Sequence, residues 1–203
     1  MAVKKILVIL LLMSCLAVAV FAQNERISDY FPAKEGMKWI YRNSDDQEST
    51  SIGVLSSNGD GNGEFTFRFS ASSNGAITDF TEYSILDNKL YITSITTALQ
   101  YIYSYPYGNR KHKDHIVLDV PGKNWRNDAD NGEHSLFTSS KSSVSYDGKT
   151  YADCICVEET RGTQRTRNYF AKNIGLVCSQ MYSQEKGWYI IDKLFQYISN
   201  DVD

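Results

Sequence analysis

Phe65-Thr66-Phe67-Arg68-Phe69-Ser70 alternates an aromatic residue with a polar one at every step. Successive side chains of a strand point to opposite faces, so this period of two predicts a strand with one buried and one solvated face. Short segments of similar character, rich in β-branched and aromatic residues, recur along the chain, at residues 38–41, 90–96, 99–105, 115–120, 143–146, 150–158, 164–171, 176–182 and 188–197. No segment sustains a helical period. We therefore expect one all-β, mostly antiparallel domain of about ten strands, built as an open barrel, a half-barrel or a sandwich.

Turn sequences between these segments indicate how the strands are connected. Asp147-Gly148 lies between two of them, and both central positions of a two-residue hairpin turn favour residues that tolerate positive φ. Glu185-Lys186-Gly187 separates the last two segments in the same way. Adjacent strands should therefore form antiparallel hairpins.

The composition is that of an ordinary folded domain. The 203 residues carry a net charge of −3, and 42% of them are hydrophobic. This hydrophobic fraction is too high, and the net charge too low, for a disordered chain. Nucleic-acid binding would call for a basic excess, so we expect no nucleic-acid partner.

The N-terminus has the pattern of a secretory signal. Lys4 and Lys5 precede an uncharged apolar run at 6–20, and small residues lead to a cleavage site between Ala22 and Gln23. The run is shorter than the roughly 20 residues of a membrane-spanning helix. The sequence therefore predicts a protein exported to the periplasm or the extracellular space.

An alternative reading of the same segment is a lipoprotein signal. Residues 12–15 read LMSC, which resembles a bacterial lipoprotein box in which Cys15 becomes acylated. The residues that follow are apolar rather than a polar tether, which favours simple secretion, and a membrane would be a partner only if Cys15 is lipidated. After a signal peptide at 1–22, we expect a flexible lead-in at 23–28 and a single β-rich domain at 29–203.

Two segments carry a family resemblance. Residues 29–41 read DYFPAKEGMKWIY, and residues 169–178 read YFAKNIGLVC. They resemble the YFPxKxGxxWxY opening and the late YYAKGVGLVK segment of a group of bacterial secreted proteins and lipoproteins, and residues 151–159 fit the strand that precedes the second motif. Asn173 replaces the commoner Gly and Cys178 the commoner Lys. The resemblance implies an exported β-rich domain and no particular reaction.

Three cysteines, Cys154, Cys156 and Cys178, remain after the signal segment. Export implies an oxidising compartment in which disulfides form. Residues two apart on a strand lie about 6–7 Å apart, which is too far for an easy disulfide. We expect free or half-buried thiols, and leave open one disulfide that involves Cys178. The spacing is not that of a zinc site.

The densest group of candidate ligand-binding residues is a tyrosine row. Tyr101, Tyr103, Tyr105 and Tyr107 would point to one face of an extended chain. Such a row offers flat apolar faces and hydroxyl groups, and it suits stacking against a ligand. A cross-strand aromatic cluster is the structural alternative.

Other polar segments have metal-like spacing but favour turns or loops. His112 and His115 lie in a short basic loop, and two ligands do not make a metal site. Residues 58–63 resemble the start of a calcium loop, but the glutamate required at its twelfth position is missing. Residues 128–133 form a second acidic loop in the wrong register. We therefore expect no metal and no cofactor.

Local catalytic motifs are absent from the sequence, which has no nucleophile elbow, zinc-protease motif, phosphate loop or dinucleotide fingerprint. Glu158 and Glu159 are adjacent, so on a strand they point to opposite faces and form no catalytic pair. The sequence favours a non-enzymatic domain of the cell envelope that binds a small ligand or an envelope protein. The alternatives are an assembly protein that uses edge strands and a secreted enzyme without a recognisable motif.

Overall fold

The computed structural model describes residues 25–199, except 60–64, 74, 98–114 and 129–131. This part of the chain forms one sheet of twelve antiparallel strands and a four-residue helix, which confirms the predicted all-β fold with more strands than expected. The elements are α2 (Ile27–Tyr30), β1 (Lys38–Arg42), β2 (Glu48–Gly59), β3 (Phe65–Ser73), β4 (Ala76–Leu86), β5 (Lys89–Thr97), β6 (Ile116–Leu118), β7 (Asn124–Asp128), β8 (His134–Tyr146), β9 (Lys149–Arg161), β10 (Gln164–Ala171), β11 (Gly175–Ser183) and β12 (Gly187–Ile198). No helix in the described ranges is long and apolar enough to cross a membrane.

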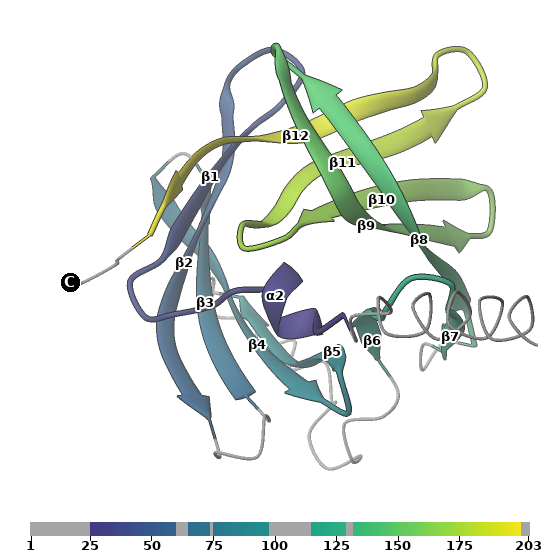
Figure 1. Cartoon of the computed structure of the whole chain (residues 1–203). Coiled ribbons are helices and arrows are strands. Elements are labelled where there is room, and N and C mark those ends of the chain that lie inside the picture. The colour runs from purple at the N-terminus through teal and green to yellow at the C-terminus, as the bar shows by residue number, and fades with distance from the viewer. Residues whose placement is uncertain (1–24, 60–64, 74, 98–114, 129–131, 200–203) are drawn as a thin grey trace, which may run out of the picture.

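The strands form a meander that returns to its start. The order is β6-β5-β4-β3-β2-β1-β12-β11-β10-β9-β8-β7, so the first and last strands are neighbours (Figure 1). In the described residues the ladder is interrupted between β6 and β7. Two side chains span that gap, because Trp125 Nε1 and Asn127 Nδ2 donate to the carbonyl oxygen of Ile116 at 2.8 and 3.0 Å. The sheet is therefore a nearly closed, barrel-like structure.

The predicted alternation in β3 provides part of the core. Phe67 and Phe69 are each 4% exposed, while Thr66 and Arg68 face outward. Phe31, directly after α2, packs against both buried rings, with centroid distances of 6.0 and 5.5 Å. Figure 1 shows α2 between the two halves of the sheet, and Ile27 and Tyr30 of this helix are buried.

The lead-in expected at residues 23–28 is ordered at its end. Ile27 is fully buried and begins α2. Asn88, in the β4–β5 turn, accepts a hydrogen bond from the Ile27 N–H at 2.8 Å and donates to the carbonyl oxygen of Glu25 at 2.7 Å. The domain therefore begins before residue 29, because these contacts attach the segment to the sheet.

The first strand is joined to the β10–β11 turn. Trp39 and Tyr41 lie on the same face of β1 and are both 5% exposed. Trp39 Nε1 donates to the carbonyl oxygen of Ile174 at 2.6 Å. That turn has positive φ at Asn173 (61°) and Gly175 (96°), a backbone conformation that Gly adopts freely and Asn tolerates.

The β8–β9 hairpin is strongly bent. Its turn is Asp147-Gly148, with φ of 49° and 75°, as predicted. The register shifts between Ser142 and Val144, and Asp153 opposite has a φ of 53°. A β-bulge of this kind bends a hairpin and increases its twist.

The bend carries the hairpin tip over β11 and β12. The hydroxyl group of Tyr146 donates to the carbonyl oxygens of Val177 and Leu194 at 2.7 and 3.3 Å. Lys193 Nζ lies 2.9 Å from Asp147 Oδ2. In Figure 1 the hairpin crosses in front of these strands, and these bonds fix its tip there.

Candidate functional site

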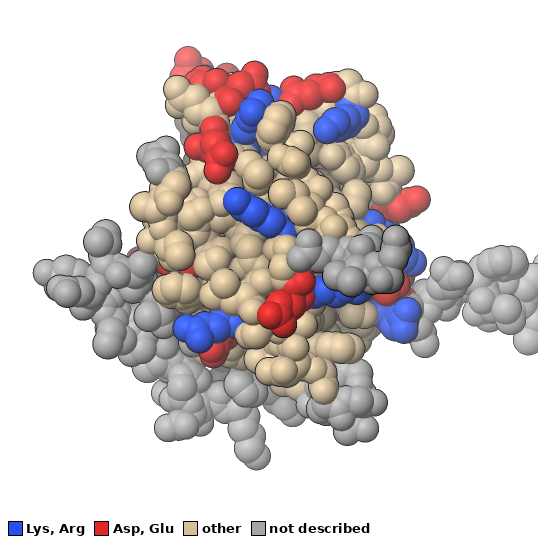
Figure 2. Space-filling view, turned by 90° about the vertical axis from the view of Figure 1, so that its left-hand side faces the viewer, with Lys and Arg blue, Asp and Glu red and all other residues tan. Residues whose placement is uncertain are grey.

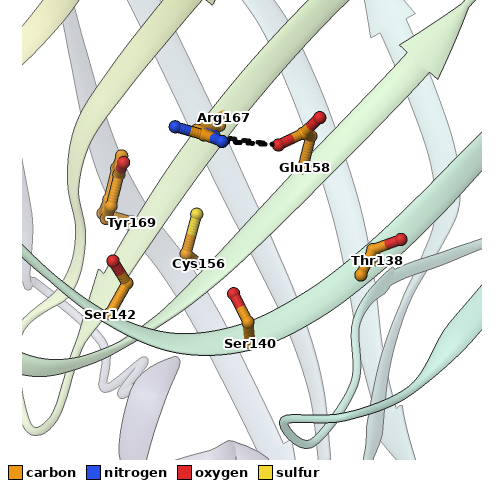
Figure 3. A pocket seen from close by; sticks show the side chains of 7 residues that line it. All are labelled: Thr138, Ser140, Ser142, Cys156, Glu158, Arg167 and Tyr169. Carbon is orange, nitrogen blue, oxygen red and sulfur yellow. Dashed lines mark hydrogen bonds and ion pairs between the residues drawn. The ribbon is translucent and has the colours of Figure 1, made fainter.

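A polar pocket of about 270 Å³ lies on the outer surface of β8, β9 and β10, and we call it the outer pocket (Figure 3). It is lined by Thr138, Ser140 and Ser142 of β8, Cys156 and Glu158 of β9, and Arg167 and Tyr169 of β10.

Strand alternation places this pocket on the face that points away from α2. Lys141 Nζ donates to the hydroxyl group of Tyr30 in α2 at 2.5 Å, so Lys141 points toward the helix. Its neighbours Ser140 and Ser142 point the other way. Ser140 pairs with Cys156 across the ladder, and both side chains therefore belong to the outer face.

Glu158 and Arg167 form the upper wall of the pocket in Figure 3. With Arg165, which lies beside the pocket, they make an ion cluster that we call the Arg165–Glu158–Arg167 cluster. Arg165 donates to Glu158 Oε1 from Nη2 at 2.6 Å and from Nε at 3.2 Å. Arg167 lies 2.9 Å from Oε2 with both Nε and Nη2. Burial alone would raise the pKa of Glu158, but the hydrogen bonds from both arginines outweigh it and lower the pKa. Glu158 is therefore ionised at neutral pH.

Two aromatic rings support the arginines of this cluster. The Arg167 guanidinium lies 3.9 Å from the centroid of the Trp188 ring. The Arg165 guanidinium lies 5.2 Å from both Trp188 and Tyr182. Cation–π contacts of this kind restrict the guanidinium planes and leave their edges available.

The opposite wall is a row of hydroxyl groups. Thr138, Ser140 and Ser142 occupy alternate positions of β8 and pair with Glu158, Cys156 and Cys154 of β9. Over the described ranges, no hydrogen bond joins the three hydroxyl groups to another protein group. They are free to bind water or a ligand.

The floor of the pocket is neutral. Burial raises the pKa of the Cys156 thiol, although Arg167 and Tyr169 partly offset this. Burial also raises the pKa of Tyr169 to about 12, and its hydroxyl group donates to Gln180 Oε1 at 3.2 Å. Cys156 is therefore a thiol and Tyr169 a phenol at neutral pH.

The three cysteines are free and buried in the structure, so the disulfide left open by the sequence is not formed. Tyr169 of β10 pairs with both Cys156 and Cys178, which puts a whole strand between these two cysteines. Burial raises the pKa of Cys154 to about 11 and that of Cys178 to about 12.

Several sequence-based candidates lie outside the described residues: Tyr101, Tyr103, Tyr105, Tyr107, His112, the cleavage site at Ala22 and Gln23, and the alternative lipidation site Cys15. The ligand-binding role of the tyrosine row thus stays a prediction. His115 is described, and its carbonyl oxygen accepts a hydrogen bond from the Ile92 N–H. Among the described residues, no group of three or more His, Cys, Asp or Glu side chains could hold a metal ion.

Most of the outer pocket was not predicted, although the sequence contains part of the signal for it. Arg165 and Arg167 are two apart on a predicted strand and therefore share a face. The prediction that Glu158 and Glu159 point to opposite faces is confirmed, because Glu159 Oε1 accepts a hydrogen bond from Ser135 Oγ at 2.6 Å rather than joining the cluster.

A second outer surface, over the first strands of the sheet, is largely uncharged. Figure 2 shows this side, with acidic side chains gathered along its upper edge. The ladder between β2 and β3 places Ser51 beside Ser72 and Gly53 beside Ser70. Ser51 and Ser72 are hydrogen-bonded through their hydroxyl groups at 2.6 Å, so these small polar groups satisfy each other.

Comparisons with known proteins reach the fold level only. No protein-family model matches the chain, and no curated protein sequence is significantly similar to it. Two crystal structures are similar in shape. A candidate exported protein with a YmcC-like fold from Bacteroides fragilis has a TM-score of 0.48 and 13% identity, over 83% of this chain and 98% of that one. A candidate lipoprotein from Parabacteroides distasonis has a TM-score of 0.46 and 12% identity over the same shares.

Proposed function

We propose that this chain is an exported domain of the cell envelope that binds a small polar ligand in the outer pocket without catalysing a reaction. The observation that carries the proposal is the pairing of two unlike walls. Three hydroxyl groups without a protein partner face an ion cluster whose geometry is fixed by aromatic rings. A concave site with a few convergent polar groups is the usual form of a small-molecule site.

The protonation states favour binding over catalysis. A nucleophilic cysteine needs a lowered pKa, whereas burial raises that of Cys156. A general acid or base needs a pKa near neutrality, whereas Glu158 is held ionised by two arginines and Tyr169 is held neutral. The groups that line the pocket therefore offer hydrogen bonds but no activated group.

Export rests on the sequence. The basic start, apolar run and small residues before Gln23 support a cleaved signal, and the resemblance of residues 29–41 and 169–178 to secreted proteins and lipoproteins agrees with it. Assembly through edge strands has weaker support. β6 is three residues long, and Trp125 and Asn127 already bond to it across the gap.

The test compares a pocket-filling variant with a matched surface variant. Ser140→Leu inserts a large side chain into the outer pocket from an exposed position, and Ser145→Leu makes the same change on β8 outside the pocket. Wild-type protein, immobilised and incubated with a small-molecule extract of its own cell envelope, should retain at least one compound detectable by mass spectrometry. Ser145→Leu should retain it and Ser140→Leu should lose it. Retention of nothing by the wild type, or of the same compounds by all three proteins, would contradict the proposal.

A further inference from the structure

We infer that the ligand of the outer pocket is an oxyanion, a small molecule that bears a carboxylate or phosphate group, and that Arg167 and the β8 hydroxyl groups bind it. This inference rests on the proposed function and adds the chemical class of the ligand. It follows from counting the donors and acceptors that the protein itself leaves unused.

The carboxylate of Glu158 has no acceptor capacity left for a ligand. An ionised carboxylate offers about four lone-pair sites on its two oxygens. Arg165 places two nitrogens on Oε1, and Arg167 places two on Oε2. A neutral sugar is commonly held by a carboxylate that accepts from its hydroxyl groups, and Glu158 is not available for that role.

Unused donors, in contrast, remain on both walls. A guanidinium carries five N–H groups, and Arg167 uses two of them for Glu158 and one for the Tyr169 hydroxyl group, so two stay unused. Trp188 covers one face of this group at 3.9 Å, so a ligand must approach the edge, where the N–H groups point. The side chain of Arg167 is 30% exposed, so that edge is reachable. Thr138, Ser140 and Ser142 add three hydroxyl donors from the other wall.

The charge of the pocket agrees with this donor excess. Among the lining residues the charges of Arg167 and Glu158 cancel, and Cys156 and Tyr169 add none at neutral pH. Arg165, which binds Glu158 from beside the pocket, brings the cluster to a net charge of +1. An anion would bind through charge-assisted hydrogen bonds, which are about twice as strong as neutral ones. The volume of about 270 Å³ is at the small end for ligand sites, which limits the ligand to roughly one sugar or one small organic acid.

The experiment uses three probes of one size that differ in charge: glucose, glucuronate and glucose 6-phosphate. Titration calorimetry at pH 7 should give at least one anionic probe an affinity more than about tenfold above that of glucose, and the affinity should fall as salt is added. Arg167→Gln should weaken the binding of that probe by about 10- to 100-fold, which is the range expected for the loss of one charge-assisted hydrogen bond. Arg161→Gln is the matched control, because Arg161 is an exposed arginine paired with Glu133 outside the pocket, and it should change little.

Three outcomes would overturn the inference: glucose binding as tightly as both anions, neither anion binding, or Arg167→Gln binding an anion like the wild type. Thermal unfolding of Arg167→Gln and Arg161→Gln shows whether a loss of binding comes from a lost contact or from a lost fold. Arg167→Lys keeps the positive charge and should retain part of the affinity for the anionic probe. The extract experiment distinguishes the two proposals. A neutral compound that Ser140→Leu loses would refute the oxyanion while supporting a ligand site, whereas an empty wild-type pocket would refute both.

Discussion

Replacing Tyr146 by phenylalanine tests how the β8–β9 hairpin, which supplies the hydroxyl wall and Glu158 of the outer pocket, is held in place. The ring is 8% exposed, and its hydroxyl group donates to two backbone carbonyls, those of Val177 and Leu194. Phenylalanine keeps the buried apolar area and leaves both carbonyls without this donor. A buried hydrogen bond contributes about 0.5–1.5 kcal/mol, and an unsatisfied buried group costs about 1–3 kcal/mol. We expect Tyr146→Phe to lower the free energy of unfolding by about 2 kcal/mol.

The measurement is thermal and urea unfolding of the wild type and Tyr146→Phe, with Tyr182→Phe as the control variant. Tyr182 is 37% exposed, and its ring contacts with Arg165 and Trp188 survive in phenylalanine. For a domain of this size, about 2 kcal/mol corresponds to a fall in Tm of roughly 4–8 °C. A change in Tyr146→Phe no larger than that in Tyr182→Phe would refute the role given to the hydroxyl group.

The pH dependence gives a second measurement on the same variant. Burial raises the pKa of Tyr146 far above its ordinary value of 10.0, so the folded protein keeps a proton that the unfolded chain loses above about pH 10. Stability from this group is complete below pH 10 and falls as the pH rises further, by up to about 1.4 kcal/mol per pH unit. Tyr146→Phe should therefore lose stability less steeply between pH 10 and 11 than the wild type does. Equal slopes would contradict the burial of an un-ionised hydroxyl group.

Three further predictions concern the site and its supports. Because the arginines lower the pKa of Glu158, the contribution of this residue to stability is present above about pH 4.3 and is lost as the pH falls through the lowered pKa. In urea unfolding between pH 5 and 3, Glu158→Gln should therefore lose less stability than the wild type. An unchanged pH profile would count against the cluster. Asn88→Gly tolerates the positive φ of 59° but removes the side-chain hydrogen bonds to Glu25 and Ile27. The variant should lower the free energy of unfolding by about 1–2 kcal/mol and speed hydrogen exchange at the Ile27 amide. Unchanged exchange at this amide would show that the two hydrogen bonds do not hold the segment. Cys154 and Cys178 should react with a thiol reagent at pH 8 only after unfolding, since both are fully buried and their pKa values are raised. Fast reaction of either thiol in the native protein would contradict its burial.

The strands that the sequence predicted are those with an apolar face or a decisive turn. Phe67 and Phe69 alternate with polar residues and are buried, and Asp147-Gly148 forms the expected turn. β2, β4 and β7 were not predicted as strands. β2 reads ESTSIGVLSSNG, and its Ser, Thr and Gly residues give it a weak hydrophobic period although both of its neighbours pair with it. Helix α2 was missed because one turn is too short to show a period.

The outer pocket escaped sequence analysis for a different reason, since it depends on register rather than on local spacing. The faces of its charged residues could be assigned from alternation alone: Glu158 opposite to Glu159, and Arg165 together with Arg167. What alternation leaves open is which residue of β9 lies across from which residue of β10.

A single turn supplies that missing register. β9 ends at Arg161 and β10 begins at Gln164, so two residues, of which Gly162 has a φ of 58°, connect the strands. A two-residue connection pairs Arg161 with Gln164, and counting back along the ladder pairs Glu158 with Arg167. A slip of one residue would move the glutamate to the opposite face from both arginines, and the cluster could not form. The charges of the cluster and the geometry of the turn thus favour the same register, and a search for tight turns between strands with charged residues of opposite sign would have located this site from the sequence.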